Sequence, residues 1–337
     1  MKFASRLAFG LVIFVIGLNV PISGQDKDKK PEKEKEKKKA EPKKQPNVFT
    51  DIATAPIDYK IQGEYVASEN TKAGKAAQVV ARGNGKFDVY LLEGGLPGAG
   101  WNVKSKKLKI EAKLDGEKNI AVFAGAGLKG VIDPAKGTLV AELEPTKSFT
   151  FTRVERTSPT MGAKPPEGAI ILFDGKNASE WNPGKMVGEL LSVPNTSKKS
   201  FSNFKLHIEF RTPFQPTAGG QGRGNSGVYL AGREVQVLDS FGLKGENNEC
   251  GGLYGYRAPD VNMCFPPLVW QTYDIEHRPG KIDPETKKQG SPTITVRHNG
   301  VLVHDNYELK GASSKGNINL QDHGNPVRYR NVWVVEK

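Results

Sequence analysis

The sequence predicts an all-β protein with two antiparallel domains, of which the second is a two-sheet jelly roll. Short segments alternate apolar and polar residues with the period of a strand, and the two-residue signals Asn84-Gly85 and Asn299-Gly300 mark hairpin turns. No segment longer than about two turns has the periodicity of a helix. A Pro- and Gly-rich linker over residues 156–168 separates the two regions of alternation.

Residues 1–24 have the pattern of an export signal. Lys2 and Arg6 precede an uncharged apolar run over residues 7–20, and Ser23-Gly24 provides small residues for cleavage. The run is shorter than the roughly 20 residues that a membrane span needs, although an uncleaved anchor is the alternative. We therefore expect a mature chain from Gln25, a periplasmic or secreted location and no stable membrane span.

Residues 25–49 are predicted to form a disordered tether, because their Lys, Glu, Asp and Pro cannot bury apolar surface. Between residues 26 and 46 the chain holds ten lysines against six acidic residues, so about half of the net charge of +12 lies in the tether and the signal. The basic composition is therefore weak evidence for a nucleic-acid partner, and we expect none.

Residues 50–155 are expected to form the smaller domain, a sandwich or meander of short antiparallel strands. This domain contains no histidine. We interpret its glycine-rich segment 94–101 as a loop anchored by Trp101 rather than as a ligand site, and we predict a binding or spacing role. The predicted strands are 77–81, 87–92, 108–114, 120–123, 130–132, 138–143 and 149–154.

Residues 169–337 are expected to form the jelly roll, whose concave sheet commonly carries a saccharide. In the strand predicted over residues 204–211, apolar residues alternate with His207, Glu209 and Arg211, which we interpret as an exposed face. The other predicted strands are 270–276, 293–297, 301–304 and 327–335.

The segment 224–240 is the most informative part of the chain. It contains two neighbouring strands, and alternation places Glu234 and Gln236 on one face. A bulge before Asp239 would add a second carboxylate to that face, a row of side chains suited to a sugar. The preceding glycine-rich loop lacks the Gly-Lys-Ser/Thr ending of a phosphate-binding loop, so we expect Arg223 to reach substrate from a loop over the cleft.

Four fragments together resemble the 3-keto-disaccharide hydrolase family, in an order and spacing that span nearly the whole second domain. The resemblance implies a concanavalin-like jelly roll and activity on glycosides oxidised at C3. It does not cover residues 50–155, which look similar to the N-terminal extensions of exported planctomycete members. The fragments are 168–176 followed by Trp181, then 225–230, 234–239, and 320–324 followed by 330–333.

A ketone at C3 acidifies the C2 proton, so a base can remove it, the enolate can expel the C1 substituent, and water can add to the unsaturated sugar. We expect Glu234 to be the base, His323 to be the acid or second base, and Arg330 to stabilise the enolate or ring oxygen. The expected substrate-binding residues are Asn225, Gln236, Asp239, Gln321, Arg223 and Trp270.

Each of these residues has a structural alternative. Glu234 could pair with Arg233 or Arg330 on a solvated face. His323 could cap a turn or hydrogen-bond backbone, and Arg330 could form a cross-strand ion pair. Trp270 could pack in a core, as tryptophan usually does.

Two other functions compete with the lyase reading. The first is a non-catalytic saccharide-binding module, for which the same fold and aromatic residues suffice. The second is a laminarinase-like retaining glycosidase with the pattern Glu-x-Asp-x-x-Glu. Here Glu234, Gln236 and Asp239 occupy those positions, so an amide replaces the central carboxylate and the required carboxylate pair is in doubt. The expected partner is an oligosaccharide or glycoside substrate, with the oligomeric state open.

Cys250 and Cys264 are the two cysteines of the chain, and an exported location permits a disulfide between them. A bridge closing a loop of about 15 residues would stabilise the fold by roughly 3 kcal/mol; two separate buried thiols are the alternative. Neither cysteine has a partner at metal-ligand spacing. We expect no cofactor; a structural calcium ion is common in this fold class, but the sequence has no motif for one.

Overall fold

The computed structural model describes residues 47–67, 74–143 and 147–337. The predicted signal peptide and the predicted tether up to residue 46 lie outside the described residues. Phe49 exchanges backbone hydrogen bonds of 3.0 and 2.9 Å with Phe214, so the last residue assigned to the tether is held in the fold. No described helix is long and apolar enough to cross a membrane.

The described chain is all-β, as the sequence predicts. Asn84-Gly85 and Asn299-Gly300 have positive φ at both residues, the geometry of two-residue hairpin turns. The described helices are short: η1 (Ile52–Thr54), α1 (Ile57–Ile61) and η2 (Gly220–Gly222).

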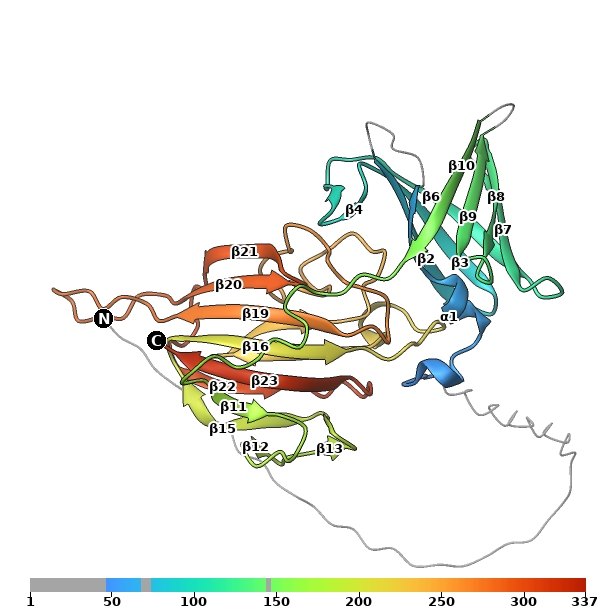
Figure 1. Ribbon diagram of the computed structural model, residues 1–337. Coiled ribbons are helices and arrows are strands. Elements are labelled where there is room, and N and C mark those ends of the chain that lie inside the picture. The colour runs from blue at the N-terminus through green and yellow to red at the C-terminus, as the bar shows by residue number, and fades with distance from the viewer. Residues whose placement is uncertain (1–46, 68–73, 144–146) are drawn as a thin grey trace, which may run out of the picture. The chain divides into compact units, whose positions relative to one another are not determined.

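The first domain is a closed antiparallel barrel of eight strands (Figure 1). The sequence predicts its strands but not its closure, which comes from the pairing of β1 with both β2 and β10 and removes free sheet edges. The strands are β1 (Gly63–Ala67), β2 (Lys75–Gly83), β3 (Lys86–Glu93), β6 (Lys107–Asp115), β7 (Ile120–Gly125), β8 (Leu128–Asp133), β9 (Thr138–Leu143) and β10 (Lys147–Val154), with β4 (Leu96–Pro97) and β5 (Gly100–Trp101) between β3 and β6.

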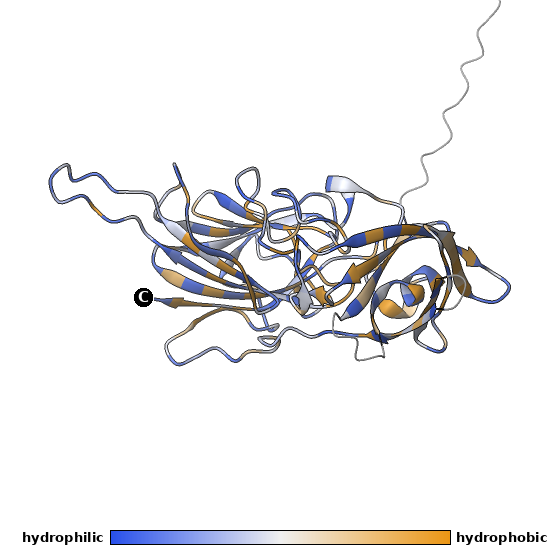
Figure 2. Cartoon of the chain, turned by 90° about the horizontal axis from the view of Figure 1, so that it is seen from above, coloured by the Kyte–Doolittle hydropathy of each residue, from blue (hydrophilic) through white to orange (hydrophobic). Residues whose placement is uncertain are grey.

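Helix α1 covers one end of the barrel, and Figure 2 shows its apolar residues within the ring of strands. Tyr59 and Ile61 of α1 belong to the same hydrophobic cluster as the inward-facing strand residues. Tyr65 donates a hydrogen bond of 2.7 Å to the Ile61 carbonyl, which fixes the helix to β1. The barrel is therefore plugged at the end where β1 begins.

The second domain packs a five-stranded sheet against an eight-stranded sheet. The five-stranded sheet has the order β12 (Trp181–Asn182), β15 (Asn195–Phe201), β22 (Gly316–Leu320), β17 (Ser226–Leu230) and β18 (Arg233–Val237). The eight-stranded sheet has the order β13 (Met186–Val187), β14 (Leu190–Leu191), β23 (Arg328–Glu336), β16 (Phe204–Arg211), β19 (Gln271–Arg278), β20 (Thr293–His298) and β21 (Val301–Glu308), with β11 (Ile170–Phe173) also on β23.

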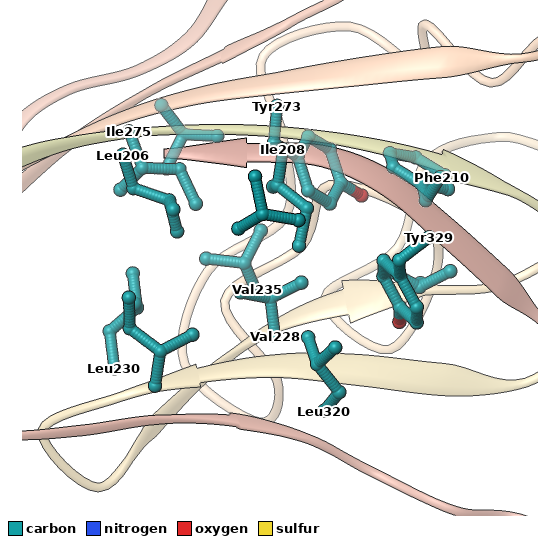
Figure 3. Close-up of a cluster of buried hydrophobic side chains, with 14 of the residues drawn as sticks. Leu206, Ile208, Phe210, Val228, Leu230, Val235, Tyr273, Ile275, Leu320 and Tyr329 are labelled. Atoms are coloured by element: carbon teal, nitrogen blue, oxygen red, sulfur yellow. The ribbon is translucent and has the colours of Figure 1, made fainter. Parts of the chain in front are cut away.

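The core of this domain lies between the two sheets (Figure 3). Ile208 and Phe210 of β16 face Val228 of β17, and all three are fully buried. Truncating such a residue to alanine typically costs about 2–5 kcal/mol. Because alternate residues of a strand point to opposite sides, the polar residues of both sheets lie on their outer faces.

The predicted exposed face of β16 is wrong for His207 and Glu209, which are each only 1% exposed. The linker covers them: Thr160 Oγ1 donates to Asp274 Oδ2 at 2.6 Å, and the Gly162 N–H donates to Glu209 Oε1 at 2.6 Å. The alternation within β16 is as expected, but a strand pattern does not show which segment packs over its polar side.

Candidate active site

Polar side chains gather on the outer face of the five-stranded sheet. Glu234 of β18 lies opposite Tyr229 of β17, and Gln236 lies opposite Gly227. Their chain neighbours Val228 and Val235 belong to the hydrophobic core, so these polar residues point away from it. The alternation predicted for Glu234 and Gln236 thus places them together on a sheet face.

Glu234 is buried, with only 7% of the residue exposed. No described residue forms a salt bridge with its carboxylate. Burial raises the pKa of Glu234, while a hydrogen bond from Tyr229 and the positive charge of His323 lower it in part. Arg233 instead donates to the Lys310 carbonyl at 2.8 Å. The alternative in which Glu234 pairs with an arginine is therefore not what the structure shows.

Tyr229 is the site residue that the sequence analysis missed. Burial, together with the hydrogen bond to Glu234, raises the pKa of Tyr229, so its hydroxyl stays a neutral donor. Gln321 Nε2 approaches the same hydroxyl at 3.4 Å. The signal was present, because positions 225, 227 and 229 share one face of a strand in the same way as 234 and 236.

Gln236 connects Glu234 to a chain of amides. Gln236 Nε2 donates to Gln221 Oε1 at 2.9 Å, Asn225 Nδ2 donates to the same oxygen at 3.1 Å, and Gln221 Nε2 donates to the Asn248 carbonyl at 2.7 Å. In this arrangement Gln236 Oε1 lies 2.6 Å from Glu234 Oε1, which is favourable only if Glu234 carries a proton.

Turning the Gln236 amide over gives its nitrogen to an ionised Glu234 at 2.6 Å, but it then sets the amide oxygen 2.9 Å from Gln221 Oε1. Gln221 must turn as well, which breaks its bonds to Asn225 and Asn248. Since amide orientation follows from the hydrogen-bond network, the orientation of Gln236 depends on whether Glu234 is protonated.

His323 lies in the exposed loop after β22, close enough for its charge to lower the Glu234 pKa. The turn is capped by Asp322, whose Oδ1 accepts from the Gly324 N–H at 2.9 Å, and Asn325 donates to the His323 carbonyl. Neither contact involves the imidazole, so the ring is not the group that caps this turn.

Asp239 does not join Glu234 and Gln236. Strand β18 ends at Val237, and Asp239 Oδ2 accepts from Arg223 Nε at 2.6 Å. Asp239 is 2% exposed and Arg223 4% exposed, and Arg223 Nη1 donates to the Ala81 carbonyl of β2 at 3.2 Å. These two predicted substrate-binding residues instead form a buried ion pair that anchors the loop to the barrel.

Arg330 and Trp270 lie on the outer face of the other sheet. Arg330 Nε donates to Glu209 Oε2 at 2.6 Å, and its guanidinium stacks 4.1 Å from the centroid of the Trp270 ring. Strand β23 belongs to the eight-stranded sheet, with the core between it and Glu234. Arg330 thus forms a cross-strand ion pair with Glu209, the alternative considered for it. Neither Arg330 nor Trp270 lies on the same face as Glu234.

Residues 168–335 match the family model of the 3-keto-alpha-glucoside-1,2-lyase-like domain. The chain belongs to this family. The lyase-like domain contains all four fragments of the predicted resemblance, which is confirmed; the planctomycete origin and the relation of the first domain stay predictions. The second domain is accordingly a carbohydrate hydrolase/lyase domain, and a saccharide is its substrate class.

Three crystal structures of candidate glycosyl hydrolases from Parabacteroides distasonis are also similar to about half of the chain. The first is 31% identical with a TM-score of 0.46, covering 51% of this chain and 85% of that one. The second is 19% identical with a TM-score of 0.40, covering 51% and 95%. The third is 20% identical with a TM-score of 0.37, covering 50% and 99%. No curated protein is significantly similar to the chain.

A cavity of about 980 Å³ lies on the opposite face of the lyase-like domain, beside Arg330 and Glu209. Burial raises the pKa of Glu209, but hydrogen bonds from His207, Asn331, Arg330 and Gly162 outweigh burial and lower the pKa to about 2. A carboxylate so fully paired is a poor base. Glu209 is therefore a weaker candidate for proton transfer than Glu234.

The predicted disulfide is not formed, because Cys250 and Cys264 are free, buried thiols. Cys250 Sγ lies 3.2 Å from the Tyr273 hydroxyl, and Cys264 Sγ contacts the Leu238 carbonyl at 3.4 Å. Among the described residues of the lyase-like domain and the barrel, no cluster of His, Cys, Asp and Glu could hold a metal ion.

Gly227 leaves room for the Glu234 carboxylate, since a Cβ there would lie 2.1 Å from Glu234 Oε1. We expect Gly227→Ala to displace Glu234 and lower kcat of the lyase-like domain about 10²-fold, because small misplacements of reacting groups are that costly. Steady-state kinetics with thermal unfolding would measure this. Gly116→Ala is the control, since its Cβ would meet nothing within 4 Å; wild-type kcat in Gly227→Ala would contradict the placement of Glu234.

Proposed function

We propose that the lyase-like domain cleaves glycosides that carry a ketone at C3, starting with removal of the C2 proton by Glu234. The observation that carries this proposal is the environment of Glu234: a nearly buried carboxylate, held by the neutral donor Tyr229 and unpaired with any described arginine or lysine. Burial raises its pKa, which makes the ionised form a stronger base than an exposed glutamate.

The proposed reaction proceeds in three steps. The Glu234 carboxylate takes the C2 proton, and the C–H electron pair forms an enolate with its charge on the C3 oxygen. The ketone then re-forms, a C1–C2 double bond appears, and the C1–O bond breaks with its electrons on the departing oxygen. Water finally adds across the double bond, giving the free 3-keto sugar and returning the proton.

The other residues on this face supply the remaining roles. His323 protonates the departing oxygen, since its ring is exposed and acts electrostatically on Glu234. Once Glu234 has taken the C2 proton, the Tyr229 O–H turns from Glu234 to the C3 oxygen, the donor role expected of Arg330, which lies on the other sheet. Asn225, Gln236 and Gln321 hold sugar hydroxyls. Export to the periplasm or the medium is proposed from the predicted signal peptide.

Turnover of a chromogenic 3-keto-glucoside beside the unoxidised glucoside tests the proposal, using the purified chain from Gln25 onward. We expect release from the 3-keto compound alone. The competing saccharide-binding module is favoured by Tyr254, an aromatic residue that is 43% exposed and whose backbone N–H donates to the Glu234 backbone carbonyl. Measurable sugar binding without release from either compound would support that module and overturn the lyase proposal.

The role of His323 has a separate test based on the leaving group. His323→Gln should lower kcat about 10²-fold or more for an alkyl 3-keto-glucoside, whose alkoxide needs a proton. The same variant should change little for a nitrophenyl 3-keto-glucoside, because nitrophenolate leaves without one. Equal losses on both substrates would show that His323 is not the acid. Recovery of alkyl-glycoside turnover by added imidazole in His323→Ala is a second readout.

A further inference from the structure

The interior of the barrel is filled along most of its length by inward-facing side chains of the strands. On β2, for example, Ala77, Val79 and Ala81 point inward and are fully buried. An eight-stranded barrel is just wide enough either for such a filling or for one small ligand. At the end where β1 begins, the interior is closed by α1, whose Tyr59 and Ile61 pack into it.

The other end of the barrel is hollow. A cavity of about 450 Å³ opens there, within the range of about 300–1,000 Å³ that small-molecule sites occupy. Ala141 and Phe151 form its buried floor. Ala76 and Leu92 also line it, and the inward-facing apolar residues of its wall are Leu91, Leu108, Leu128, Leu143 and Phe149.

Strand register shows that this wall is the continuation of the barrel interior. Leu91 lies opposite both Ala77 and Leu108, and Phe149 lies opposite Ala141. Alternation then points each of these side chains inward. Leu108 is 38% exposed and Leu143 is 41% exposed, although both face the inside of a barrel. The described residues thus leave part of the apolar surface at this end exposed, where a ligand could cover it.

The same inward rows end in lysines at the rim. The β2 row that contains Ala77 continues to Lys75, and the β10 row of Phe151 and Phe149 continues to Lys147. Among the described residues that line the cavity, Lys106, just before β6, is the third lysine, and Glu93 is the one acidic residue. Lys75 Nζ lies 3.7 Å from the centroid of the Phe149 ring, which holds this ammonium over the apolar wall.

We propose that this end of the barrel binds a small molecule with an apolar chain and one anionic group, of the class of a medium-chain carboxylate. The apolar chain would cover the exposed leucines, a gain of about 25 cal/mol for each Å² removed from water. The carboxylate would meet Lys75 and Lys147 at the rim, where three lysines and one glutamate are the charged residues among those described. This site is independent of the chemistry proposed at Glu234.

Calorimetric titration of the chain from Gln25 onward with decanoate tests the site, with decyltrimethylammonium as the cationic probe of the same chain length. We expect decanoate to bind and the ammonium compound to bind at least about tenfold more weakly, because charge complementarity discriminates between them. Lys75→Glu combined with Lys147→Glu should lose about tenfold or more of the decanoate affinity.

Lys86→Glu combined with Lys113→Glu is the matched control, since these lysines pair across β3 and β6 and their neighbours Phe87 and Ala112 take the inward positions. Decanoate should bind this variant within about twofold of wild type. Ala141→Leu adds volume to the cavity floor and should weaken decanoate without changing any charge. Equal binding of both probes, equal losses in both double variants, or no decanoate binding would overturn the proposal.

Discussion

Glu234→Gln is expected to lower kcat on the 3-keto-glucoside by about 10²–10⁴-fold, the usual contribution of a positioned proton-transfer group. The amide keeps the shape of the side chain and its contacts with Tyr229 and Gln236, so KM should change little. Steady-state kinetics measures both constants. Glu308→Gln, the same change at an exposed glutamate of β21, should leave them unaltered.

The same variant should make the protein more stable at neutral pH. Burial raises the Glu234 pKa above its unfolded value, so the folded state loses stability as pH rises through that raised pKa. Below the unfolded pKa both states are protonated and the penalty is absent. Glu234→Gln should therefore unfold at a higher temperature than wild type at neutral pH, with the difference vanishing in acid.

The wild-type pH profile follows from the same shift. Because the base must be ionised, kcat/KM should fall as pH drops through the raised Glu234 pKa, at a higher pH than an exposed glutamate would give. Retained turnover in Glu234→Gln, or a stability difference that persists in acid, would contradict the assignment. The first result would remove Glu234 as base, and the second would remove burial as the cause of its shifted pKa.

Local pattern was enough to predict that Glu234 and Gln236 of β18 share one face of the sheet. Glu234 and Gln236 are two positions apart, so a strand of any register places them on one face. The same rule applied to β17 would have placed Tyr229 on this face, although the sequence analysis did not use it there. Arg330 could not be placed this way, because the sheet to which β23 belongs is decided by its pairing with β16, more than 100 residues earlier in the chain.

The alternation of apolar and polar residues likewise could not predict that the barrel closes or that the linker covers His207 and Glu209. The barrel closes because β10 returns to pair with β1, a contact that neither strand's own sequence specifies. His207 and Glu209 are buried because the linker lies over them and donates hydrogen bonds to the carboxylates of Asp274 and Glu209. A linker rich in proline and glycine is expected to be exposed to solvent. Its sequence does not indicate which strands of the folded chain it contacts.

The buried pair Arg223–Asp239 gives the largest expected loss of stability. Asp239→Ala should reduce the free energy of unfolding by about 3–5 kcal/mol, because it leaves the Arg223 guanidinium buried without its carboxylate. This corresponds to a fall of the unfolding temperature on the order of 10 °C. Chemical denaturation and thermal unfolding would measure both quantities.

A double variant separates the structural role of this pair from the substrate contacts first expected of it. Arg223→Met combined with Asp239→Leu removes both charges, so it should be more stable than Asp239→Ala alone. If the pair only anchors the loop to β2 through the Ala81 carbonyl, the folded double variant keeps the wild-type KM for the 3-keto-glucoside. A KM raised about tenfold or more in this variant would return Asp239 or Arg223 to the substrate site. That result would mean that the buried pair separates when sugar binds, because in the structure Arg223 and Asp239 form an ion pair with each other.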